Sequence, residues 1–276
     1  MSIQLGKILI TGATGLVGAR LVPRLQKMGW ECVALVRKGK NVPSGITMME
    51  GDLFDTPTLA QAVKGVSAII HLAAVFRTQD TDLIWKSNLE GTHNLIMAAK
   101  EHNPGVRFIF ASTNHVYNIN NSHPGCEEDV VEPQHPYPAS KVEAEKELRV
   151  SELNWSILRF PFVYGDADGH LESLQGHAIA GKMHPAMKIS TIHHLDIATA
   201  MNVVLAGAMD RRIVNITDEA TLSVYELIQI AGGKMEPSAE PLQNPWHLHA
   251  DGSLARSLGF QPMIRTVYQA AQENLL

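Results

Sequence analysis

The sequence has little of several features that define particular classes of protein. Its 276 residues include two cysteines, Cys32 and Cys126, which are too few for a disulfide framework or a structural zinc site. The formal net charge is −5 and there is no long basic run, so nucleic acid is not an expected partner. The longest apolar stretch, 66–76, is too short to span a bilayer. The first residues, MSIQLGK, lack the apolar core of a signal peptide. We therefore expect a cytoplasmic protein with no membrane partner and no metal site.

What the sequence does contain is a regular alternation of two patterns. Short apolar runs of the kind that form buried strands alternate with segments in which apolar residues recur at helical spacing. This alternation predicts an α/β fold with a doubly wound parallel sheet and helices on both faces. The expected strands are 7–11, 31–37, 46–53, 67–74, 106–113 and 154–160, and the expected helices are 16–28, 57–64, 82–101 and 137–153.

The alternation loosens after Gly165. Residues 165–189 show no clear periodicity, whereas 190–206 is typical of a loop followed by a helix and 212–218 of a strand. Small helices and turns are expected at 221–232 and 251–260. We predict a dinucleotide-binding Rossmann domain of residues 1–164 with 190–217, and a small C-terminal substrate-binding lobe of residues 165–189 with 218–276.

Three glycines stand three residues apart in TGATGLVG (11–18), between the first strand and the first helix. Gly12 suits a tight turn, Gly15 a close backbone approach to a ligand, and Gly18 close packing of helix on sheet. The helix N-terminus then presents free N–H groups and a positive dipole end to a pyrophosphate. The alternative is a strand–helix turn with no ligand, but the strand–turn–helix context favours a dinucleotide site.

The glycine stretch and several later segments resemble the extended short-chain dehydrogenase/reductase family, also called the NAD-dependent epimerase/dehydratase family. The resemblance covers nearly the whole chain and implies a Rossmann fold and a nicotinamide cofactor. The spacing of the glycine stretch is Gly-x-x-Gly-x-x-Gly. The other segments that carry it are GDL (51–53), HLAA (71–74), NLEGTHNL (88–95), FASTNHVY (110–117), YPASK (137–141), RFPFVYG (159–165) and IHHLDIA (192–198).

Tyr137 and Lys141 are the sequence's Tyr-x-x-x-Lys pair, and a spacing of four places both on one face of a helix. A free tyrosine has a pKa of about 10 and is a poor base at neutral pH. We expect the Lys141 ammonium and the positive nicotinamide ring to lower the pKa of Tyr137. Tyr137 would then exchange a proton with a substrate oxygen. The alternative is a chance pair on a helix surface.

The resemblance implies two further members of the catalytic group. Thr113, four residues before the tyrosine of FASTNHVY, matches the hydroxyl that polarises the substrate oxygen, while Ser112 is expected to be structural. A threonine bonded locally at the end of a strand is the alternative for Thr113. Asn88 matches a residue that organises the site in the family, and it equally fits a buried helix asparagine.

The residue after the second strand is expected to choose the cofactor. Family members that prefer NAD carry an acidic residue there, but this chain has Arg37. Arg37 could bind the 2′-phosphate of NADP(H), so NADP(H) is the favoured cofactor and NAD(H) remains possible. The alternative for Arg37 is a solvated surface arginine with no role in cofactor binding. Asp52 resembles the residue that binds the adenine amino group. The other implied cofactor contacts are Thr14, Leu16, Val17, Leu53, Leu72, Ala73, Ala74, Pro161 and Val163.

Departures from the family pattern bear on the substrate. Asn114 and His115 follow Thr113 where sugar-nucleotide dehydratases carry carboxylates, so 4,6-dehydration is disfavoured. STNH instead resembles the Ser-Asn-His stretch of uronate dehydrogenases. Residues 160–162, Phe-Pro-Phe, lack the asparagine with which nucleotide-sugar enzymes contact a diphosphate. We expect a compact substrate contacted by Phe76, Asn114, His115 and Phe162.

These observations predict an NAD(P)-dependent oxidoreductase that transfers hydride between the cofactor and a small hydroxyl or carbonyl substrate, such as a sugar acid or a ketone. Two alternatives remain open: a nucleotide-sugar epimerase and a non-catalytic NADP-binding regulator. The helices at 82–101 and 137–153 are where family dimers pair, so we expect a homodimer.

Overall fold

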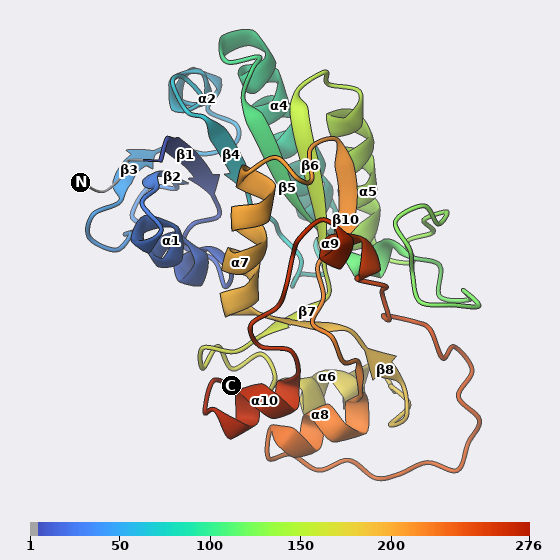
Figure 1. Cartoon of the computed structure of the whole chain (residues 1–276). Helices are drawn as coiled ribbons and strands as arrows, with labels where there is room; N and C mark the ends of the chain where they lie inside the picture. The colour runs from blue at the N-terminus through green and yellow to red at the C-terminus, as the bar shows by residue number, and fades with distance from the viewer. Residues whose placement is uncertain (1–4) are drawn as a thin grey trace. The chain divides into compact units, whose positions relative to one another are not determined.

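A computed structural model describes residues 5–276 (Figure 1). Residues 1–4 lie outside the described residues. They begin the segment MSIQLGK, in which the sequence predicts no signal peptide. The chain divides into two compact units. Unit 1 holds the residues up to 112 with 133–158 and 204–213, and unit 2 holds 113–132, 159–203 and 214–276. The domain boundaries drawn from the sequence stay a prediction.

The central sheet has seven strands within residues 5–276, in the order β10-β6-β5-β4-β1-β2-β3. β1 pairs with β2 and β4, β2 with β3, and β4 with β5, all in parallel. The order reverses between β1 and β4, as in a doubly wound sheet, so the predicted fold class is confirmed. The strands are β1 Lys7–Thr11, β2 Glu31–Val36, β3 Thr47–Glu50, β4 Ala68–His71, β5 Arg107–Thr113, β6 Asn154–Phe160 and β10 Arg212–Asn215.

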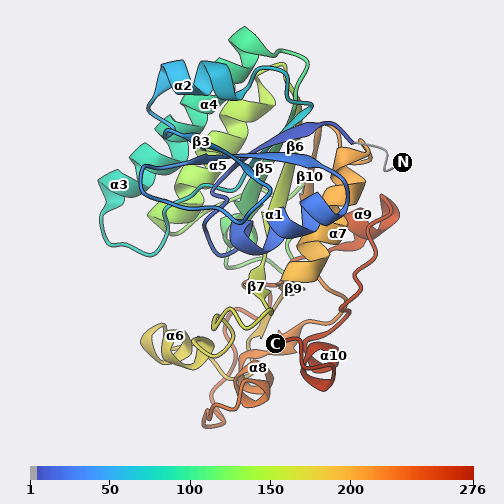
Figure 2. The same cartoon turned by 90° about the vertical axis from the view of Figure 1, so that its left-hand side faces the viewer.

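The helices of unit 1 cover both faces of the sheet. Figure 2 shows α2, α4 and α5 on one face and α1 on the other. Leu9, Ile69 and Phe108 point from the strands into the first of these layers, where they pack with Leu95 and Leu148 of the helices. Each such side chain stabilises the fold by about 1.5–3 kcal/mol when fully buried. The helices are α1 Gly18–Lys27, α2 Thr56–Ala62, α3 Thr81–Trp85, α4 Gly91–His102 and α5 Pro136–Arg149.

Local signals set where several helices begin. The Asp55 carboxylate accepts a hydrogen bond from the Thr58 amide, 3.2 Å away, and so caps α2. Asp80 caps α3 in the same way, through the amide of Leu83. Pro136 occupies the first turn of α5, where no backbone N–H is required. The expected helix at 82–101 is divided between α3 and α4 by a π-helical turn, Lys86–Glu90.

Unit 2 is built from short elements. β7 (Phe162–Tyr164) pairs in parallel with β9 (Thr191–His193), and β8 (Lys188–Ile189) pairs in antiparallel with β11 (Leu222–Ser223). The stretch at 165–189, for which the sequence showed no clear periodicity, contains the helix α6 (Leu174–Ala180). The expected strand at 212–218 ends earlier, at Asn215. The helices are η2 Asn114–Val116, α6 Leu174–Ala180, α7 His194–Leu205, α8 Val224–Ile230, α9 Ser253–Ser257 and α10 Val267–Gln272.

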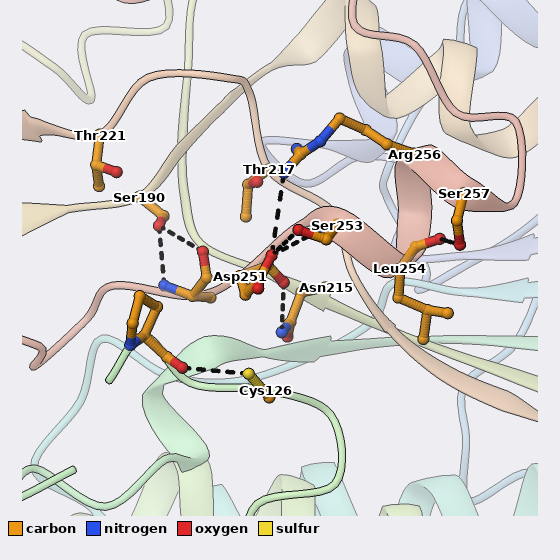
Figure 3. A network of polar contacts seen from close by, with 12 residues as sticks. Cys126, Ser190, Asn215, Thr217, Thr221, Asp251, Ser253, Leu254, Arg256 and Ser257 are labelled. Carbon is orange, nitrogen blue, oxygen red and sulfur yellow. Dashed lines mark hydrogen bonds and ion pairs between the residues drawn. The ribbon is translucent and has the colours of Figure 1, made fainter. Parts of the chain in front are cut away.

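A polar network joins residues of unit 2 that lie far apart in the sequence (Figure 3). The Asn215 side-chain amide donates hydrogen bonds to the carbonyl oxygens of Gly125 and Asp251, at 3.0 Å each. The Ser190 hydroxyl accepts from the amide of Ala250, also at 3.0 Å. These bonds satisfy buried backbone groups in a region with little regular secondary structure. Within residues 5–276 no helix has the length and apolar character needed to cross a membrane.

Candidate active site

The glycine loop joins β1 to α1. Gly12 has a φ of +73°, and a Cβ there would lie 2.6 Å from the backbone nitrogen of Ala73, in the segment after β4. A Cβ on Gly18 would lie 2.2 Å from the Gly12 carbonyl oxygen. A Cβ on Gly15 would meet one atom within 4 Å, the same oxygen at 3.3 Å, so most of its surroundings are open. Glycine is therefore required at two positions by the protein's own packing, whereas Gly15 leaves room for a ligand.

The residues around this loop fit a dinucleotide. Thr14 and Gly15 are exposed in the loop before α1, whose first turn contains no acidic residue to repel a phosphate. Arg37 is exposed directly after β2, where the ribose of the adenosine half would lie in a Rossmann fold. Asp52 is also exposed, and its carboxylate accepts a hydrogen bond from the Phe54 amide at 2.7 Å. The Leu53 carbonyl accepts from Asn94 at 2.9 Å.

Tyr137 and Lys141 lie one turn apart near the N-terminus of α5. Tyr137 is half-buried, and its ring centroid is 5.6 Å from that of Phe76. Lys141 is 1% exposed, and its Nζ lies 3.9 Å from the centroid of the Phe110 ring. The predicted pair therefore occupies a protected position beside the end of β5, with an aromatic face supporting the ammonium.

Burial sets the protonation of both groups. Desolvation raises the pKa of Tyr137 to about 12. Desolvation also lowers the pKa of Lys141 to about 7, while the negative charge of Glu145 acts in the opposite direction. The direction of the change in the pKa of Tyr137 is thus opposite to the lowering that was expected from Lys141, because burial penalises the charged phenolate. Tyr137 is a neutral phenol at pH 7.

Asn88 is fully buried in the π-helical turn between α3 and α4. Its amide nitrogen donates to the Val75 carbonyl at 2.8 Å and to the Ser140 hydroxyl at 3.1 Å. Its amide oxygen accepts from the Val75 backbone N–H at 2.8 Å. The Ser140 hydroxyl in turn donates to the carbonyl of Tyr137. Asn88 therefore joins the segment after β4 to the first turns of α5.

His71 at the end of β4 is a site neighbour whose role the sequence did not indicate. Its two ring nitrogens lie 2.6 Å from the Thr11 hydroxyl and 2.8 Å from the Thr92 hydroxyl. Complete burial, followed by the charge of Lys141, lowers the pKa of His71 to about 3. His71 is therefore neutral at physiological pH and connects β1, β4 and α4 beneath the glycine loop.

The remaining predicted site residues belong to unit 2. Thr113 is buried at the end of β5, and its hydroxyl accepts a hydrogen bond from the His115 amide at 3.2 Å. Asn114 is buried, and its Nδ2 donates to the Leu248 carbonyl at 3.0 Å. Its Oδ1 is buried without a hydrogen-bond partner. His115 is exposed.

The segment that follows β6 carries the other predicted contacts of unit 2. Pro161 and Val163 are buried. Phe162 stacks on the imidazole of His170, with centroids 4.2 Å apart. The Phe162 ring itself offers no hydrogen-bond donor, which agrees with the apolar character read from Phe160 to Phe162.

The sequence also gave no sign of one donor cluster in unit 2. Potential ligand atoms of His123, Cys126 and Asp129 lie within 4.8 Å of one another. They already have partners: His123 Nδ1 and the Cys126 thiol both bond the Pro124 carbonyl, and the Asp129 carboxylate accepts from the Cys126 amide. The absence of a metal site stays a prediction.

The chain has a Rossmann-type fold, and its α5 carries a Tyr-x-x-x-Lys pair of the kind found in short-chain dehydrogenases. A model of the NAD dependent epimerase/dehydratase family matches residues 8–223, and the chain belongs to that family. The resemblance inferred from the sequence and the prediction of an enzyme are both confirmed.

Three similar proteins illustrate the range of this family. A 3-beta-hydroxysteroid dehydrogenase of Mycolicibacterium neoaurum is 32% identical over 124 residues, 41% of this chain and 33% of that protein. UDP-glucuronate 4-epimerase 1 of Arabidopsis thaliana is 30% identical over 182 residues, 57% of this chain and 42% of that protein. The solved structure of MoeE5 with UDP-glucuronic acid and NAD has a TM-score of 0.78 at 25% identity and covers 98% of this chain and 97% of that one. The matches to the hydroxysteroid dehydrogenase and to the UDP-glucuronate 4-epimerase thus span less than half the length of those two proteins.

Proposed function

We propose that this protein is an NAD(P)-dependent dehydrogenase or reductase that transfers hydride to or from a small hydroxyl or carbonyl compound. The observation that carries the proposal is the protected pair on α5, with Tyr137 neutral at pH 7 and Lys141 buried one turn away. A catalytically silent regulator would have no need for a buried lysine at this position, because burying an ammonium costs free energy.

Each residue of the site has a defined task in this reaction. The glycine loop would hold a nicotinamide cofactor, which would supply or accept the hydride. Tyr137 holds its proton at neutral pH, which is the form that donates to the oxygen of a carbonyl as it is reduced. The Lys141 ammonium stabilises the phenolate that remains. The Thr113 hydroxyl, assigned from the sequence pattern, orients the substrate oxygen.

Polar groups of unit 2 support a compact, oxygen-rich substrate. Asn114 has a buried Oδ1 with no partner, and such an atom gains most from a ligand hydroxyl that donates to it. Neither Asn114 nor His115 can act as the carboxylate base of an elimination. We therefore place free sugar acids and hydroxy ketones first among the substrates, with Phe76 and Phe162 as apolar contacts.

A nucleotide-sugar epimerase is the second candidate. Its support is the 30% identity to a UDP-glucuronate 4-epimerase. An epimerase returns the hydride to the carbon from which it came, so it consumes no cofactor overall. Net cofactor turnover therefore separates the two candidates.

Three narrower features complete the proposal. NADP(H) is preferred over NAD(H), because Arg37 stands where NAD-preferring members carry an acidic residue. The protein forms a homodimer through α4 and α5. It acts in the cytoplasm. The first rests on the charge of one side chain, and the other two on sequence reasoning.

The test is a panel of sugar acids, their lactones, simple ketones and UDP-, GDP- and dTDP-sugars, incubated with NADPH or NADH while absorbance and products are followed. We expect stoichiometric oxidation of NADPH with a small carbonyl compound. Tyr268→Phe, at a tyrosine 47% exposed on α10, is the matched control and should retain full activity. Epimerised sugar nucleotide without net cofactor consumption, and no turnover of the small compounds, would replace the proposal by the epimerase.

A further inference from the structure

Glu145 is a buried carboxylate on the helix that carries the catalytic pair. It is 3% exposed, one turn after Lys141 on α5. Its acidic neighbours on this helix behave differently, since Glu143 pairs with Lys146 and Glu147 with His93 at the surface. Burying a charged carboxylate is costly unless other groups compensate for the lost water. Its position therefore requires a specific environment.

That environment comes from β5 and from the same face of α5. The Ser112 hydroxyl donates a hydrogen bond to Oε1 of Glu145, and Ser112 is itself buried. Side chains four residues apart on a helix have Cβ atoms about 5–6 Å apart, so Glu145 and Lys141 are neighbours. Lys141 also lies over the ring of Phe110, two residues before Ser112 on β5. An ammonium, an aromatic ring, a carboxylate and a hydroxyl thus form one buried row.

Burial and the groups around Lys141 have different effects on its pKa. Burial drives Lys141 toward its neutral form, and the negative charge of Glu145 opposes this effect. His71, which faces Lys141 from β4, is neutral because its own pKa is about 3. Tyr137 on α5 is neutral as well at pH 7. Because the pKa of Lys141 is about 7 even with this support, loss of the Glu145 charge would leave the lysine mostly uncharged at neutral pH.

We propose that Glu145 is a positioning residue that keeps the Lys141 ammonium charged for its work with Tyr137, and that Ser112 fixes the Glu145 carboxylate for this purpose. The inference rests on the proposed function of the tyrosine–lysine pair. It assigns a task to Ser112, which the sequence analysis treated as structural. It also explains why a third residue at the same helical spacing is acidic and buried.

The titration of Lys141 can be measured without any substrate. In protein labelled with 13C-lysine, the Lys141 Cε resonance is the one lost in Lys141→Met, and its shift against pH reports the charge. Glu145→Gln keeps the size of the side chain and an oxygen that accepts from Ser112. We expect this variant to move the Lys141 midpoint down by about 1–3 pH units. Glu143→Gln, at an acid of the same helix whose side chain is 44% exposed, should leave the midpoint unchanged.

Two further variants test the coupling between Glu145 and Lys141. Ser112→Ala removes the hydrogen bond that fixes the Glu145 carboxylate and should also lower the Lys141 midpoint, which tests the proposal even if Glu145→Gln does not fold. Glu145→Asp keeps the charge and should restore most of the Lys141 midpoint. An unchanged Lys141 midpoint in folded Glu145→Gln, or in folded Ser112→Ala, would overturn the inference. A shifted midpoint in a protein that turns over no substrate would refute the proposed function and leave the coupling between Glu145 and Lys141 standing.

Discussion

Asn88→Ala tests whether the buried asparagine holds the active site together or takes part in the reaction. The substitution removes three hydrogen bonds: two with the backbone of Val75 and one with Ser140. A typical intramolecular hydrogen bond contributes a net of about 0.5–1.5 kcal/mol, so the three together contribute about 3 kcal/mol. At about 2–4 °C per kcal/mol for a chain of this size, we expect the melting temperature to fall by about 6–12 °C.

The assay is thermal unfolding with turnover measured on the same samples. Asn41→Ala, at an exposed asparagine between β2 and β3, is the control and should leave both quantities unchanged. Turnover of Asn88→Ala should fall as well, because Ser140 and the first turn of α5 lose their support. A melting temperature within about 2 °C of the wild type, together with a large loss of turnover, would refute the structural role and favour a direct one.

Three other perturbations follow from the site. Gly15→Ala should weaken NADPH binding with little loss of stability. Gly18→Ala should lower the melting temperature as well, because its Cβ would lie 2.2 Å from a backbone oxygen. Equal losses of stability in the two variants would contradict these different roles. Arg37 should make NADPH bind about tenfold to more than a hundredfold more tightly than NADH, as a charge-assisted bond contributes about 1.5–3 kcal/mol; calorimetric titration showing equal affinities would reverse the assignment. The pKa of His71 is lowered to about 3 in the folded protein, so its contribution to stability is complete above about pH 6.5 and falls as the pH drops toward 3, by about 1.4 kcal/mol per pH unit. Denaturant unfolding at several pH values should show this slope, and His71→Asn should reduce it.

The parts of the fold that the sequence predicted are those with strong local signals. The apolar runs at 7–11, 31–37 and 106–113 had to be buried strands, and the glycines fixed the turn after the first of them. The π-helical turn at Lys86–Glu90 had no such signal, because its residues follow an ordinary helical pattern. The short strand β8 and helix α6 were missed for a related reason, since their packing partners come from distant parts of unit 2.

In the candidate site, too, residues with a local sequence signal were predicted, whereas residues whose role depends on tertiary burial were not. Tyr137 and Lys141 were predicted from their spacing together with the family resemblance of the surrounding segments, and their catalytic role stays a prediction. His71 and Glu145 were not, because a histidine in a strand and a glutamate in a helix are ordinary until their burial is known. The direction of the Tyr137 pKa was also beyond the sequence, since it depends on how much water reaches the hydroxyl.

The central claim is that Tyr137 supplies the proton in a reaction with net hydride transfer. The most direct measurement is NADPH oxidation at 340 nm by wild-type protein and Tyr137→Phe, with the best small carbonyl substrate and with product quantified. We predict one alcohol formed per NADPH oxidised, and a fall in turnover of about 10²–10⁴-fold in Tyr137→Phe with nearly unchanged cofactor affinity. Retention of more than half the wild-type rate by Tyr137→Phe, at a step shown to be chemistry, would contradict the account.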